Sequence, residues 1–73
     1  MLARFDSKKF LSTRKEKNLT QATVATAANT TIRYVRDMEK GKKDNPSATI
    51  LYGLSAALDV PMESLMTEQE ESE

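Results

Sequence analysis

The sequence predicts an all-α fold, a compact bundle of five short helices, and three observations lead to this prediction. Asp, Ser and Thr residues that favour helix N-caps precede segments in which apolar residues recur at three- and four-residue spacing. Residues 19–41 (LTQATVATAANTTIRYVRDMEKG) form two short helical segments joined by a turn of about three or four residues. No segment shows the period-two alternation that is typical of a strand.

The first predicted helix begins after a short N-terminal arm, Met1 to Phe5. Asp6 or Ser7 is a suitable N-cap, and the helix runs to about Lys17 with Phe10 and Arg14 on one face. Asn18 then tolerates the left-handed conformation that ends many helices.

The second predicted helix is capped by Thr20 and runs from Gln21 to about Ala28. Its inward face consists of small apolar residues, which let helices approach closely: Val24, Ala25 and Ala28.

The third predicted helix follows a bend at Asn29, again a residue that tolerates positive φ. Thr30 or Thr31 caps it, and it continues to Lys40. Gly41 stands where glycine closes helices. Val35 and Met38 supply its buried stripe.

Two further helices are expected in the second half of the chain. Ser47 caps the fourth, whose apolar residues at helical spacing are Ile50, Leu51, Leu54 and Leu58. Gly53 inside it indicates an exposed or closely packed position, since glycine costs about 1 kcal/mol relative to alanine there. Pro61 begins the fifth, with Leu65 and Met66 inward. We expect one domain, residues 1–66, followed by a disordered acidic tail, residues 67–73.

Composition excludes several function classes. The chain has 73 residues, with no cysteine and no histidine, which removes disulfides, thiolate metal sites and the usual general base. We therefore expect no enzyme, no metal and no cofactor. No apolar run approaches the ~18–20 residues that span a bilayer, and a signal-peptide core is absent, so a cytoplasmic protein is expected. A chain this small buries only about 60% of its unfolded surface, so a partner subunit would help to stabilise it.

The net charge of zero conceals a complete separation of sign. All eleven basic residues lie in the first 43 positions with four acids, a net charge of +7, and the remaining thirty residues carry seven acids and no base. A polyanion would be attracted by the first part and repelled by the second, which orients binding. The alternative is that the charges only solubilise the two ends of the chain.

Residues 10–66 resemble the phage-repressor-like helix-turn-helix family, the Cro or XRE type. The motifs that carry the resemblance are Leu19-Thr20-Gln21, Ala25, Glu39-x-Gly41, the Lys42-to-Pro46 loop and Leu58-Asp59-Val60. The resemblance implies a lambda-repressor-like DNA-binding domain with the helix-turn-helix as helices two and three. It also implies a structural ion pair between Arg14 and Glu39, and a tight helix crossing at Ala25.

The same resemblance assigns the DNA contacts. Base contacts fall on the exposed start of the third helix: Ile32, Arg33, Arg36 and Asp37. An arginine can bind guanine O6 and N7 bidentately, Ile32 could press on a thymine methyl, and Asp37 could accept from cytosine N4 or orient Arg33. Phosphate contacts are expected from the residues that flank this helix: Gln21, Thr31, Tyr34, Lys42 and Lys43.

The expected function is a sequence-specific transcriptional regulator, a repressor or autoregulator, that binds a two-fold-symmetric DNA operator as a homodimer. No small-molecule ligand and no membrane partner are expected. The dimer surface is assigned to the last two helices, although some of its residues could belong to the monomer core: Tyr52, Leu58, Met62, Leu65 and Met66. The alternatives are a protein-interaction adaptor or an antitoxin-type regulator with the same fold. An adaptor would have no need of an exposed basic face.

Overall fold

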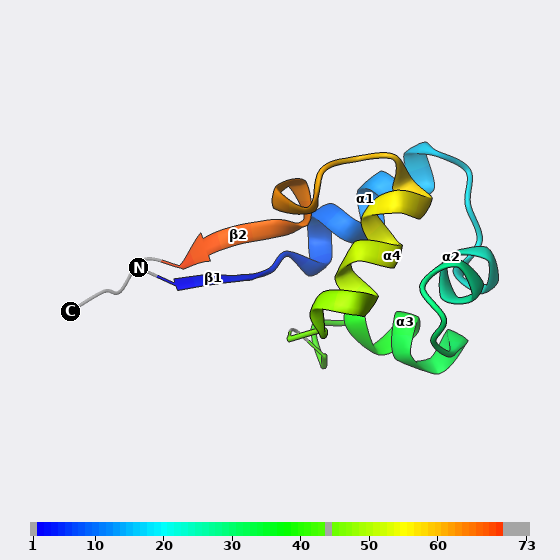
Figure 1. The fold of residues 1–73 in the computed structure, drawn as a ribbon, viewed down its shortest axis with the longest axis horizontal. Helices are drawn as coiled ribbons and strands as arrows, with labels where there is room; N and C mark the ends of the chain where they lie inside the picture. The colour runs from blue at the N-terminus through cyan, green and yellow to red at the C-terminus, as the bar shows by residue number, and fades with distance from the viewer. Residues whose placement is uncertain (1, 44, 70–73) are drawn as a thin grey trace.

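Four α-helices and a small terminal sheet make up the computed structural model of the chain, which describes residues 2–43 and 45–69. Figure 1 shows the helices packed into one body, with the sheet projecting from it. In chain order the elements are β1 (Leu2–Phe5), α1 (Ser7–Glu16), α2 (Gln21–Ala27), α3 (Ile32–Glu39), α4 (Ala48–Leu58), the 3-10 turn η1 (Met62–Leu65) and β2 (Met66–Gln69). None of the described helices is long and apolar enough to cross a membrane.

All four α-helices begin at a side-chain cap that the sequence offers. Asp6 accepts from the Lys9 N–H at 3.1 Å and Thr20 accepts from the Thr23 N–H at 3.0 Å. At α3 the cap is Thr31, not Thr30, and at α4 it is Ser47. Each oxygen satisfies one of the N–H groups that a first helical turn leaves without a partner.

The four α-helices also end in the same way, each followed by one residue in the left-handed conformation. These residues are Asn18 (φ 59°), Asn29 (φ 58°), Gly41 (φ 83°) and Asp59 (φ 58°). After α1, for example, the Leu19 N–H donates to the Arg14 carbonyl at 3.1 Å, closing the turn. The conformations predicted for Asn18 and Asn29 are confirmed, and Asp59 is a further position of the same kind.

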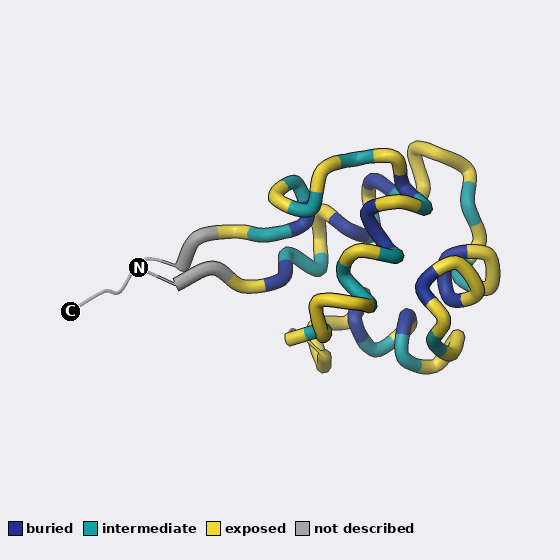
Figure 2. Tube along the Cα trace, viewed as in Figure 1, coloured by how far each residue is buried: buried dark blue, intermediate teal, exposed yellow. Residues whose placement is uncertain are grey.

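The core lies where α1, α2, α3 and α4 meet, and Figure 2 shows the buried positions on the inner sides of these helices. Its members are Phe5, Phe10, Val24, Ala25, Ala28, Val35, Met38, Leu54, Leu58 and Leu65. The apolar stripes predicted for α2 and α3 are therefore confirmed.

Gly53 allows α4 to approach α2 at its C-terminal end. A Cβ placed on Gly53 would lie 2.6 Å from the Cα of Ala28 and 3.2 Å from the Ala27 carbonyl oxygen. The glycine is thus required by close packing, one of the two explanations that its place inside a helix allowed.

The prediction of five helices and no strand was wrong. Only the single turn η1 follows Pro61, because the chain becomes extended at Met66 (φ −118°, ψ 152°) after Leu65 has entered the core. Met66–Gln69 then pairs antiparallel with Leu2–Phe5. This pairing satisfies backbone groups of two terminal segments that lack a helical alternative.

The sheet therefore includes residues that the sequence assigned to an arm and to a tail. Phe5 pairs with Met66, Arg4 pairs with Thr67, and the Asp6 N–H continues the ladder to the Leu65 carbonyl at 2.8 Å. The predicted tail at Thr67 thus begins with paired strand, and its residues 70–73 lie outside the described residues. The sheet lengthens the molecule to 40 × 21 × 20 Å.

Candidate nucleic-acid interface

Helix α3 has one face in the core and one face in solvent. Val35 and Met38 are fully buried, whereas Ile32 is 43% exposed and Arg33 and Arg36 are exposed. The exposed side chains come from positions one turn apart, so they share a surface while the buried pair fixes the helix against the body. This arrangement presents two guanidinium groups on a rigid support.

The turn between α2 and α3 sets the orientation of α3 relative to α2. Asn29 takes the left-handed conformation, and the Thr30 N–H donates to the Ala25 carbonyl at 2.9 Å. Thr31 then caps α3 by accepting from the Tyr34 N–H at 3.0 Å. Ala25 is 2% exposed at the crossing, which agrees with the tight packing that the resemblance implies.

A polar network joins α1, α2 and α3 behind the exposed face. The Arg14 Nε–H donates to Glu39 Oε2 at 2.5 Å, forming the ion pair that the resemblance implies. Arg14 Nη1 also donates to the Leu19 carbonyl at 2.7 Å, and Gln21 Nε2 donates to Glu39 Oε1 at 2.8 Å. The Arg14 and Glu39 side chains are only 12% and 7% exposed, so these bonds orient the helices in a largely dry environment.

The bond from Gln21 to Glu39 was not anticipated from the sequence, which assigned Gln21 to a phosphate contact. The two residues are 18 positions apart, and nothing in the local pattern connects them. The only feature of the sequence that could have indicated this bond is the residue type. A glutamine amide has two hydrogens and can donate one to a carboxylate and the other to a second acceptor.

A basic loop follows α3. The Lys42 and Lys43 N–H groups both donate to the Asp37 carbonyl, at 2.9 and 3.3 Å, and both side chains are exposed. The loop therefore presents its two ammonium groups next to the C-terminal end of α3.

The remaining predicted DNA contacts lie around this face. Thr31 is exposed at the start of α3, and Asp37 is half-buried. Tyr34 is half-buried and packs against the core cluster. Among the described residues Asp37 forms no ion pair with Arg33, so the orienting contact that the sequence allowed is not made.

The predicted dimer surface is only partly accessible. Leu58 and Leu65 are fully buried and belong to the core cluster of the protomer, so their assignment to an interface was wrong and the alternative, monomer core, holds for both. Tyr52 is 66% exposed, and Met62 and Met66 are half-buried. A shallow depression of about 320 Å³ beside Tyr52 is lined by Ser55, Ala56, Asp59, Val60 and Pro61.

Comparisons with known proteins agree on one class of domain. The family described as Helix-turn-helix matches residues 12–65. The chain is 35% identical over 60 residues to the HTH-type transcriptional regulator SinR of Bacillus licheniformis, which covers 82% of this chain. It spans only 54% of that relative's length.

Solved structures resemble the fold closely. The restriction-modification controller protein C.AhdI from Aeromonas hydrophila superimposes with a TM-score of 0.74 at 29% identity, covering 81% of this chain and 88% of that one. A structure of SinR, a master regulator for biofilm formation, in complex with DNA gives a TM-score of 0.74 at 30% identity, covering 81% and 97%.

Proposed function

The chain belongs to the XRE-type helix-turn-helix family, and from that membership we propose that it is a sequence-specific DNA-binding transcriptional regulator that places α3 in the major groove. The observation that supports this most directly is the division of α3, with Val35 and Met38 buried and Arg33 and Arg36 exposed. The complex of SinR with DNA adds support from a relative. A regulator of this kind would act in the cytoplasm.

Base reading is assigned to the exposed start of α3. Arg33 and Arg36 would each grip a guanine through O6 and N7, worth about 1–3 kcal/mol of discrimination per pair. Ile32, 43% exposed, suits a thymine methyl. Asp37 is half-buried at the edge of this face and would accept from a cytosine N4 amino group.

Phosphate contacts are assigned to the residues around α3. Lys42 and Lys43 would neutralise phosphates next to the C-terminal end of the helix, and the Thr31 hydroxyl and Tyr34 would act at its first turn. Gln21 keeps one amide hydrogen on Glu39 and would offer the other to a phosphate oxygen. In this arrangement the DNA backbone is tied to the same network that orients α3.

The protein would act as a homodimer on a two-fold-symmetric operator, as a repressor or autoregulator. One α3 reads only a few base pairs, and half-sites about 10 bp apart would let two copies bind one face of the duplex. Tyr52, with the neighbouring depression and the half-buried Met62 and Met66, is the surface assigned to the second copy.

Selection of binding sites from a random duplex pool tests the proposal. The parent chain should enrich a symmetric sequence, and Arg33→Ala and Arg36→Ala should each relax the preference at particular base pairs. Lys42→Ala and Lys43→Ala are the matched controls, since loss of a phosphate contact weakens all sequences alike.

Two outcomes would contradict the proposal at different levels. Equal weakening of every sequence by Arg33→Ala and Arg36→Ala would reassign both arginines to phosphate. Failure of the parent chain to bind any duplex at low salt would favour a protein-interaction adaptor with this fold.

A further inference from the structure

The start of α1, which directly follows β1, lies beside the turn that ends α3. A Cβ placed on Gly41, which follows that helix, would lie 3.9 Å from the Ser7 Oγ at the start of α1. Arg4 is three residues before Ser7, and Lys43 is two residues after Gly41. The segments that carry these two basic positions, far apart in the sequence, therefore approach each other near the C-terminal end of α3.

Arg4 is held on the outer side of the sheet. Its neighbour Phe5 is 2% exposed, with its ring 5.4 Å from that of Phe10, so Phe5 anchors the base of β1 in the core. Successive side chains of a strand point to opposite faces, and Arg4 is accordingly exposed. Pairing of Arg4 with Thr67 fixes this register.

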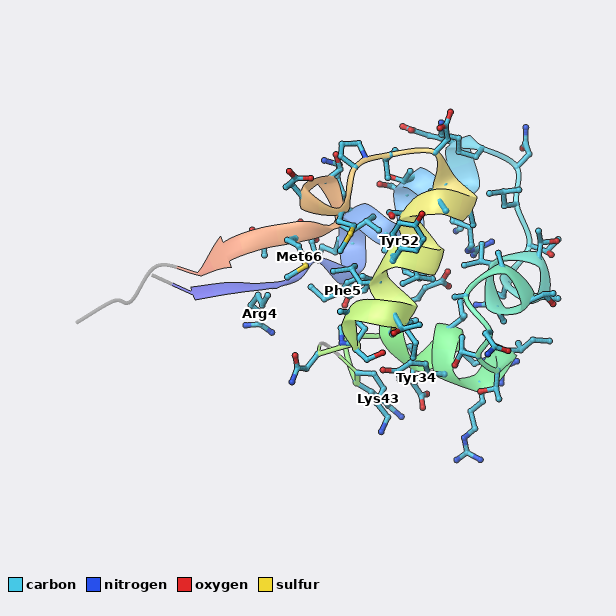
Figure 3. The ribbon with its side chains drawn as sticks, viewed as in Figure 1. Arg4, Phe5, Tyr34, Lys43, Tyr52 and Met66 are labelled. Atoms are coloured by element: carbon cyan, nitrogen blue, oxygen red, sulfur yellow. The ribbon has the colours of Figure 1, made fainter. Side chains whose placement is uncertain are left out.

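The side chain of Arg4 points toward the side of the molecule that is proposed to bind DNA (Figure 3). In Figure 3 the side chains of Arg4 and Lys43 extend toward the same edge of the molecule, the edge along which α3 lies. Asp6, the acid nearest to Arg4 in the chain, accepts from the Lys9 N–H at its helix cap. Arg4 makes an interaction within the protein as well, but a guanidinium carries five N–H donors and can serve two acceptors.

We propose that Arg4 contacts the phosphate backbone of the bound DNA beyond Lys42 and Lys43, so that the DNA interface extends from the helix-turn-helix onto the terminal sheet. This inference rests on the proposed function. A paired strand has already lost the conformational freedom of a loose arm, so the contact would form without a large ordering cost. The contact would increase affinity for all sequences and would carry no base specificity.

The experiment measures binding to a fluorescein-labelled random-sequence duplex of about three helical turns, ~30 bp, over a series of salt concentrations. The variant is Arg4→Gln. Lys17→Gln is the matched control, because this substitution also removes one positive charge. Lys17 is exposed and lies at the C-terminal end of α1, the opposite end from Ser7.

Arg4→Gln should bind the duplex more weakly than the parent does. The plot of log K against log salt falls with increasing salt, and in this variant it should be less steep by about 0.9, the value for one phosphate contact. When the salt concentration rises fourfold, the factor by which Arg4→Gln loses affinity should therefore be about 3.5 times smaller than the factor for the parent. Lys17→Gln should keep the parent's slope. Arg4→Lys should also keep it, since the cation is retained.

Each alternative result overturns the proposal. A slope equal to the parent's for Arg4→Gln, or the same decrease for Lys17→Gln, would show that Arg4 has no contact of its own. A reduced slope for Arg4→Lys together with a lowered melting temperature would assign the effect to folding of the sheet. If the parent chain binds no duplex, the proposed function fails as well; if the parent binds and Arg4→Gln keeps its slope, only the present inference fails.

Discussion

Gly53 and Ala28 bring two helices into contact nearly backbone to backbone. A Cβ at Gly53 would lie 2.6 Å from the Ala28 Cα and 3.1 Å from its Cβ, so α4 has no room for even a methyl group there. Helix α2 packs against α3 as well as against α4, so the Gly53–Ala28 contact joins α4 to the helix-turn-helix.

Gly53→Ala should destabilise the protein by about 1–3 kcal/mol, because overpacking outweighs the gain of about 1 kcal/mol in helix propensity. Urea unfolding followed by circular dichroism measures the change. Ala56→Gly, at an exposed position of the same helix, is the control and should cost about 1 kcal/mol. An increase in stability for Gly53→Ala would show that the helices can move apart without cost.

Arg14→Met should destabilise the fold by about 3 kcal/mol, since it leaves the nearly buried Glu39 carboxylate without its cation. Adding Glu39→Leu should recover more than half of that loss, because the unpaired charge is then removed. Urea unfolding of the two variants provides the measurement. A double variant no more stable than Arg14→Met would contradict the argument, because the unpaired charge of Glu39 would then not be the cause of the loss.

Gln21→Ala tests the third member of the same network. It removes one hydrogen bond to Glu39 but leaves the ion pair, so its cost should be about 1 kcal/mol, well below that of Arg14→Met. The comparison of the two unfolding free energies decides whether the amide or the guanidinium orients Glu39.

Asp59→Gly should stabilise the protein by about 1 kcal/mol. Asp59 has φ 58° directly after α4, a conformation that glycine adopts without steric cost, and its charge lies near the negative end of the helix dipole. Asn18→Gly, with the same φ but no charge to remove, is the matched variant and should gain less. Thermal melting gives both values, and a loss of stability at Asp59 would contradict the argument.

Tyr52→Glu should weaken self-association at least tenfold, if the exposed ring packs against a second copy as proposed. Sedimentation velocity over a concentration series measures this effect. Thr26→Glu, on the exposed side of α2, introduces the same charge elsewhere and should leave association unchanged. An unchanged dimer in Tyr52→Glu would place the interface on another surface.

The sequence by itself determined the four helix starts, most of the helix ends and the two-sided character of α3. These features depend on signals within a few residues: a capping oxygen at Thr20 or Ser47, a residue that tolerates positive φ at Asn18 or Asn29, and apolar spacing at Val35 and Met38. Because the causes are local, their consequences could be predicted locally.

Only the tertiary structure decided how the two ends of the chain pair and which apolar residues remain accessible. Arg4 and Thr67 are partners across almost the whole chain, and four-residue strands carry too little pattern to reveal such pairing. Helical spacing likewise marks Leu58 and Leu65 as apolar without telling whether the body or a second copy covers them. Whether the body or a second copy covers these residues depends on how the helices pack against one another. The sequence of a single segment does not contain this information.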